Sequence, residues 1–103
     1  MNINASIKKQ YLEQIIKGVK TTEYREMTDY WTKKLVDVES YKGKDVAEII
    51  EGLQTGKLEL HPRAIKQMTF YCERKKGAIY KVTDIRAYKG HKLFAIGLGK
   101  RVE

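Results

Sequence analysis

At 103 residues and 42% apolar content, the chain is long enough for one packed core but too short to divide into two domains. Its apolar runs are far shorter than the about 20 residues of a membrane-spanning helix and no signal-peptide pattern is present, so we expect a cytoplasmic protein without a membrane anchor. The formal net charge is +8, and one cysteine with two histidines excludes an internal disulfide and predicts no metal site and no cofactor.

The positive charge is concentrated in the last part of the chain. Residues 62–103 contain eleven Lys and Arg against three Asp and Glu, whereas residues 35–61 contain three against six. A basic surplus favours a polyanionic partner such as RNA, because each phosphate that a cation neutralises releases counterions. Solubility alone would account for the charge equally well, so composition leaves both interpretations open.

The N-terminal part predicts a strand followed by a helix. Residues 2–7 alternate polar and apolar side chains, as a half-buried strand does. Residues 8–18 predict a helix of about three turns that ends at Gly18, a residue suited to the left-handed conformation. The apolar side chains on one face of this helix are Tyr11, Leu12, Ile15, Ile16 and Val19.

Residues 20–27 show no helical stripe and predict a second strand. Thr21, Glu23 and Arg25 would share one face of it. The next segment, residues 28–36, is ambiguous: Thr28 either caps a short helix that presents Tyr30, Trp31 and Leu35, or begins an ordered loop.

The strongest helix signal covers residues 45–55. Asp45 and Glu48 have the spacing of a capping box, and Gly56 is placed to end the helix. The outward face, with Glu48 and Glu51, is acidic, which makes the helix a poor phosphate binder and favours a role as a cover over the sheet.

The last third of the chain predicts three strands. Two β-rich runs flank a turn predicted at residues 75–77, and residues 93–98 form a closing strand. Gly97 and Gly99 in that strand indicate a bulge or a close backbone approach. We expect Cys72 in the core and the tyrosines of these strands, Tyr71, Tyr80 and Tyr88, to be half-buried. His61 and His91 are expected in loops without a special role.

The junction between the first helix and the second strand carries the pattern Gly-x-Lys-x-x-Glu-x-Arg, as Gly18, Lys20, Glu23 and Arg25. It begins at the glycine that ends an amphipathic helix, and that helix follows an N-terminal strand. This combination resembles the ASCH domain family, whose members are small PUA-like β-barrels with the same signature at the same junction. The resemblance covers about residues 2–100.

The element order predicts an α+β fold. The resemblance implies a small PUA-like/ASCH β-barrel of about five strands with two to three flanking helices. Residues 1–103 would then form a single ASCH-like domain, in which residues 37–62 are a helical insertion relative to the shortest family members.

The resemblance also implies a cleft lined by Lys20, Glu23 and Arg25 and a link to RNA or nucleoside chemistry. In such a cleft, Arg25 offers a fork of donors, Lys20 a point charge, and Glu23 an acceptor for a base amino group. The residues that we expect to contact RNA or a nucleotide are Lys20, Arg25, Tyr30, Trp31, Lys33, Lys34, Arg74, Lys75 and Lys76. Trp31 would alternatively pack in the core, and residues 74–76 would alternatively form a solvated turn.

Two other functions remain open. Lys20, Glu23 and Arg25 would be the catalytic residues of an RNA-directed hydrolase, either a ribonuclease or a nucleoside amidohydrolase. Amidohydrolase relatives carry a threonine where Glu23 stands and a late carboxylate that is missing between Arg86 and Val102, which weakens that assignment. A protein-interaction module would instead dock a partner through residues 45–55. The sequence does not indicate the oligomeric state.

Overall fold

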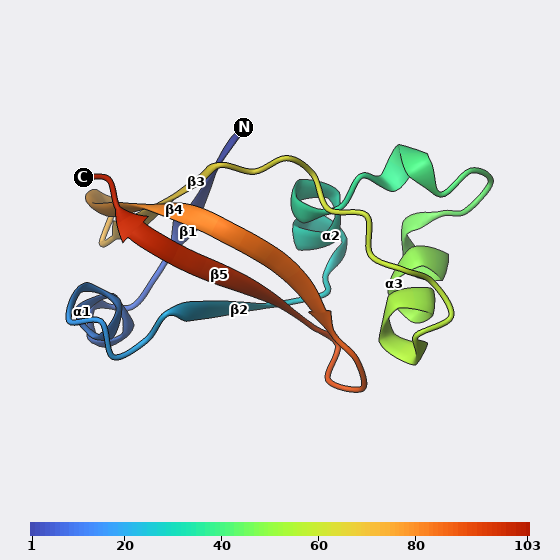
Figure 1. Ribbon diagram of the computed structural model, residues 1–103, viewed down its shortest axis with the longest axis horizontal. Coiled ribbons are helices and arrows are strands. Elements are labelled where there is room, and N and C mark those ends of the chain that lie inside the picture. The colour runs from blue at the N-terminus through green and yellow to red at the C-terminus, as the bar shows by residue number, and fades with distance from the viewer. The chain divides into compact units, whose positions relative to one another are not determined.

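The fold is α+β, as predicted, with five strands in one sheet and three α-helices (Figure 1). The computed structural model describes all residues, 1–103. In chain order the elements are β1 (Asn2–Ser6), α1 (Lys9–Ile16), β2 (Thr22–Glu26), α2 (Asp29–Leu35), the 3-10 helix η1 (Val38–Ser40), α3 (Val46–Thr55), β3 (Gln67–Cys72), β4 (Lys75–Tyr88) and β5 (Leu93–Arg101). The order of hydrogen-bonded neighbours in the sheet is β1-β3-β4-β5-β2.

The chain forms two compact units. Unit 1 contains residues 1–23, 64–84 and 97–103, and unit 2 contains residues 24–63 and 85–96. The three strands β2, β4 and β5 each contribute residues to both units. Whether the units unfold together, as a single domain over residues 1–103 requires, stays a prediction.

Unit 1 is built on the parallel pair β1 and β3, with Ile3 opposite Met68. β3 pairs in turn with β4 in antiparallel register. The buried apolar side chains of this unit are Ile3, Ala5, Leu12, Ile15, Ile65, Met68, Phe70, Ala78, Tyr80 and Leu98.

The apolar face of α1 is narrower than the sequence predicts. Leu12 and Ile15 are buried, but Tyr11, Ile16 and Val19 are 41%, 43% and 77% exposed. The helix has only eight residues, so only two positions spaced by one turn reach the interior. Gly18 adopts a left-handed conformation with φ 77°, as predicted for the end of this helix.

The hairpin turn lies two residues earlier than predicted. β3 ends at Cys72, β4 begins at Lys75, and these two residues are paired across the hairpin. The turn is therefore Glu73 and Arg74, both left-handed with φ 51° and 69°. Gly77 serves packing instead, since a Cβ there would lie 2.5 Å from Leu12 Cδ2.

The two glycines of β5 mark a close approach, one of the two predicted alternatives. A Cβ on Gly97 would lie 2.0 Å from Asp84 Oδ1, and one on Gly99 would lie 2.8 Å from Thr83 Cγ2. Cys72 is half-buried instead of lying in the core, because it is the last residue of β3 before the turn. Of the three strand tyrosines, Tyr71 is half-buried as expected, whereas Tyr80 is buried and Tyr88 is exposed.

Unit 2 contains α2 and α3, which pack against each other (Figure 1). The ambiguous segment is helical, and the Thr28 hydroxyl caps it by accepting a hydrogen bond from the Trp31 N–H. Both bonds of the predicted capping box are present at the start of α3, which ends at Gly56 with φ 79°. The buried apolar side chains of this unit are Met27, Leu35, Val36, Tyr41, Ile49, Ile50, Leu53, Phe94, Ala95 and Ile96.

The hydroxyl of Tyr41 holds the segment that follows α3. It donates a hydrogen bond to the Glu59 carbonyl and accepts one of 2.8 Å from the His61 N–H. The Tyr41 ring also stacks on the His61 ring, with centroids 5.0 Å apart. Burial raises the pKa of Tyr41, an effect that the hydrogen bond from His61 reduces in part.

We expect Tyr41→Phe to lower the free energy of unfolding by about 1–2 kcal/mol near neutral pH, because two part-buried backbone groups lose their partner. A pKa raised in the folded state means that the stabilisation is complete below the unfolded pKa of about 10 and is lost as the pH rises through the folded pKa. The difference in the free energy of unfolding between the wild type and Tyr41→Phe should therefore become smaller at alkaline pH.

Urea denaturation near neutral pH and above about pH 10 measures this difference. Tyr88→Phe, at an exposed tyrosine, is the control, and an equal alkaline change in that variant would contradict the prediction.

Candidate functional site

The lysine and the glutamate of the motif meet in unit 1. Lys20 Nζ lies 2.7 Å from Glu23 Oε1 in a salt bridge. Glu23 is only 4% exposed, and the Lys20 ammonium also lies 5.3 Å from the centroid of the Tyr11 ring. The backbone N–H of Lys20 donates a hydrogen bond of 3.1 Å to the Gln14 carbonyl. This bond ties the backbone of Lys20 to α1. The end of α1 and the start of β2 therefore position the pair.

The arginine of the motif lies in unit 2 and stacks on an aromatic ring. The Arg25 guanidinium carbon is 5.2 Å from the centroid of the Trp31 ring. Trp31 contacts Tyr30 edge to face at 5.3 Å, and Lys34 Nζ is 5.6 Å from the Tyr30 ring. We call the four side chains Arg25, Tyr30, Trp31 and Lys34 the aromatic-cation surface.

Helix α2 sets the geometry of the aromatic-cation surface. Tyr30 and Lys34 are four residues apart and so share one side of the helix. Tyr30 is 58% exposed, whereas Trp31 is half-buried. Trp31 therefore lies between the two predicted alternatives, packing in the core and contact with RNA. One aromatic ring of the surface is thus open to solvent and the other is fixed by packing.

The remaining predicted contacts lie apart from that surface. Lys33 is exposed on α2. In unit 1, Arg74, Lys75 and Lys76 are exposed at the hairpin, and Lys76 Nζ forms a salt bridge of 2.9 Å with Glu103. The hydrogen bond and charge of Glu103 raise the pKa of Lys76. Arg74, in the turn, and Lys75, the first residue of β4, have no such partner.

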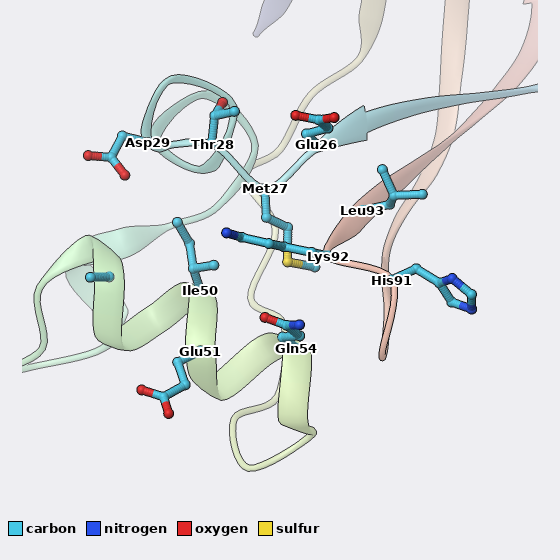
Figure 2. A pocket seen from close by; sticks show the side chains of 11 residues that line it. Glu26, Met27, Thr28, Asp29, Ile50, Glu51, Gln54, His91, Lys92 and Leu93 are labelled. Atoms are coloured by element: carbon cyan, nitrogen blue, oxygen red, sulfur yellow. The ribbon is translucent and has the colours of Figure 1, made fainter.

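Unit 2 also contains a cavity of about 560 Å³ that the sequence did not reveal (Figure 2). It lies between the end of β2, the start of α2, helix α3 and the β4–β5 turn, and its lining residues are Glu26, Met27, Thr28, Asp29, Ala47, Ile50, Glu51, Gln54, His91, Lys92 and Leu93. Figure 2 shows the Lys92 side chain reaching from the turn toward α3. The Lys92 carbonyl accepts a hydrogen bond of 2.9 Å from the Met27 N–H, which holds the turn in place.

The charge of this cavity argues against a phosphate site. The lining includes three acidic residues, Glu26, Asp29 and Glu51, against a single lysine, Lys92. Neither this cavity nor a second one of about 490 Å³ in the same unit is lined by Lys20, Glu23 or Arg25. The proposed cleft around these three residues stays a prediction. His91, expected to have no special role, lines the cavity from an exposed position.

Comparisons with known proteins give no further identification: no protein-family model, no curated protein and no solved structure matches the chain. None of the helices combines the length and the apolar content needed to cross a membrane. No group of three or more His, Cys, Asp or Glu side chains is placed to hold a metal ion. Membership of the ASCH family therefore stays a prediction, based on the residues of the motif and on the order of the elements.

Proposed function

We propose that the protein is an ASCH-like, PUA-related β-barrel domain that binds single-stranded RNA or a nucleotide. The observation that carries the binding proposal is the Arg25 guanidinium held 5.2 Å from the Trp31 ring, at one end of a row in which two adjacent rings lie between two cations. The family part of the proposal rests on Gly18, Lys20, Glu23 and Arg25. In this proposal, the rings of the aromatic-cation surface would contact the bases, and its cations Arg25 and Lys34 would contact the phosphates.

The aromatic-cation surface supplies what single-stranded nucleic acid needs. An exposed ring such as Tyr30 accepts a stacked base of any identity, because every base has a π-face. Lys34 and Arg25 lie beside the rings and would neutralise the phosphates on either side of that base. Such a surface recognises unpaired RNA and carries little sequence preference.

The two units differ in the long-range attraction that they offer. Unit 1 contains eleven Lys and Arg against five Asp and Glu, whereas unit 2 contains ten against eight. Most of the net positive charge therefore belongs to unit 1. RNA binding should weaken steeply as salt is raised, since cations of both units would contribute to counterion release.

The test of RNA binding is fluorescence anisotropy with a labelled oligouridylate of about ten nucleotides. We expect Tyr30→Ala to weaken binding by about 5- to 150-fold, because one stacked base is worth about 1–3 kcal/mol. Arg25→Ala should weaken binding and also reduce its dependence on salt. Tyr88→Ala and Lys42→Ala remove an exposed ring and an exposed cation of unit 2 outside the surface and should change little. Equal losses in these controls, or no binding by the wild type, would refute the proposal.

A second candidate function, an RNA-directed hydrolase, is favoured by the Lys20–Glu23 contact. A proton donor and an acceptor lie 2.7 Å apart, and the carboxylate is almost completely buried. Such a pair serves acid–base chemistry if substrate reaches it. Turnover of RNA or of an acylated nucleoside by the purified protein, lost in Lys20→Met and not restored in Lys20→Arg, would support this function. Restoration by Lys20→Arg would assign the pair a structural role.

A further inference from the structure

The second cavity of unit 2, about 490 Å³, has a lining unlike that of the first. It is formed by the end of α3, the segment that follows this helix, the last residues of β4 and the start of the β4–β5 turn. Its lining residues are Leu53, Gly56, Lys57, Leu58, Glu59, Leu60, Ile85, Arg86, Ala87 and Lys89. This volume lies within the range of about 300–1,000 Å³ that is typical of small-molecule sites.

Backbone contacts fix the walls of this cavity. The Leu58 N–H donates to the Gly52 carbonyl at 3.0 Å, and a Cβ on Gly52 would lie only 2.3 Å from Leu58 Cδ1. The segment after α3 therefore packs directly on the helix at Gly52, where a side chain would displace Leu58. On the other side, the Gly90 N–H donates to the Gln54 carbonyl at 3.2 Å and ties the β4–β5 turn to α3. The cavity is thus formed by the fold itself.

The chemistry of the lining is aliphatic and cationic. Five lining side chains are aliphatic: Leu53, Leu58, Leu60, Ile85 and Ala87. Three cations, Lys57, Arg86 and Lys89, outnumber the single carboxylate of Glu59. Lys57 and Lys89 form no salt bridge, and the side chain of Lys89 extends over Gly56, where its Nζ lies 3.5 Å from the place of a Cβ. Both ammonium groups are available to an anion.

The lining is also less suited to a nucleotide base than to an aliphatic chain. No aromatic ring borders the cavity, so a base has nothing to stack on. No side-chain amide or hydroxyl is present to read the edge of a base. An aliphatic chain, in contrast, gains free energy from burial against leucine and isoleucine.

We propose that this cavity binds an aliphatic carboxylate, with the chain on the leucine side chains and the carboxylate on Lys57 and Lys89. The site is independent of RNA binding, because it contains none of the residues of the aromatic-cation surface. The acidic lining of the first cavity would repel the same ligand.

The test is a titration of the full chain with decanoate, followed by amide chemical shifts and by calorimetry. Decanoate should bind saturably and shift the amides of residues 53–60 and 85–89. The double variant Lys57→Glu, Lys89→Glu should weaken binding by about tenfold or more, because it removes charge-assisted contacts and adds repulsion. Ala87→Phe, which fills the cavity and keeps both lysines, should weaken it as well.

The matched control is Lys42→Glu with Lys44→Glu, the same charge change at two exposed lysines of unit 2 that do not line the cavity. It should leave decanoate binding unchanged. Decanol, with the same chain and no charge, should bind more weakly, and AMP should not shift these amides. Absence of saturable shifts, equal weakening in the control, or AMP binding at the same residues would overturn the proposal.

Discussion

Phe70→Ala is expected to lower the free energy of unfolding by about 3–5 kcal/mol, a large part of the stability of a chain of this size. Phe70 lies in β3 of unit 1, is 0% exposed and contacts the Tyr80 ring with centroids 6.2 Å apart. Its partner across the β3–β4 pair is Ala78, which cannot expand into the space left by the ring. The substitution thus leaves a cavity in addition to the lost burial.

Urea denaturation followed by far-ultraviolet circular dichroism and by Trp31 fluorescence measures this effect. Trp31, the sole tryptophan, lies in unit 2, whereas Phe70 lies in unit 1. If residues 1–103 form one cooperative domain, both signals should shift to lower urea together. Val19→Ala, at a residue that is 77% exposed, should shift neither. A shift in circular dichroism without one in Trp31 fluorescence would contradict the single-domain prediction.

Elements with local signals were predictable from the sequence. The boundaries of α3 follow from the Asp45–Glu48 capping box and from Gly56, which act within a few residues of the chain. Thr28 is a cap of the same kind, and only the weak apolar pattern after it left α2 ambiguous. Caps and terminating glycines fix local backbone geometry whatever packs around them.

Features that depend on distant segments were not predictable. The sequence predicts the turn at residues 75–77 because Gly77 favours a left-handed conformation. Glu73 and Arg74, which form the turn, do not favour it. The packing of Gly77 against Leu12 brings together α1 and β4, which are far apart in the chain. Spacing alone does not show such a contact.

The candidate sites divide in the same way. The meeting of Lys20 and Glu23 follows from a helix end and a strand. The four-residue spacing of Tyr30 and Lys34 could also be read from the sequence, whereas the Arg25–Trp31 contact needs the actual path of the chain between β2 and α2. The first cavity is assembled from three separate segments of the chain and the second from two, so no local pattern indicates them.

The double variant Glu73→Asn, Arg74→Gly is expected to raise the free energy of unfolding by about 1–3 kcal/mol. Both residues of the two-residue turn have positive φ, which costs a residue with a Cβ about 1–2 kcal/mol. Asn-Gly is the sequence that this hairpin geometry favours most. Urea denaturation measures the change, and an unchanged or lower midpoint would show that the turn stores no strain.

RNA binding by the same variant decides why a strained turn carries these side chains. If Arg74 contacts a phosphate, the stabilised variant should bind oligouridylate more weakly, and the slope of log affinity against log salt should fall by about 1. Glu13→Gln with Arg101→Ala removes one exposed carboxylate and one exposed cation elsewhere in the same unit, which is the same charge change, and is the control. A larger loss in the turn variant than in the control would mean that stability is given up for a phosphate contact. Equal losses would mean that Arg74 makes no specific phosphate contact and contributes only to the overall positive charge of unit 1.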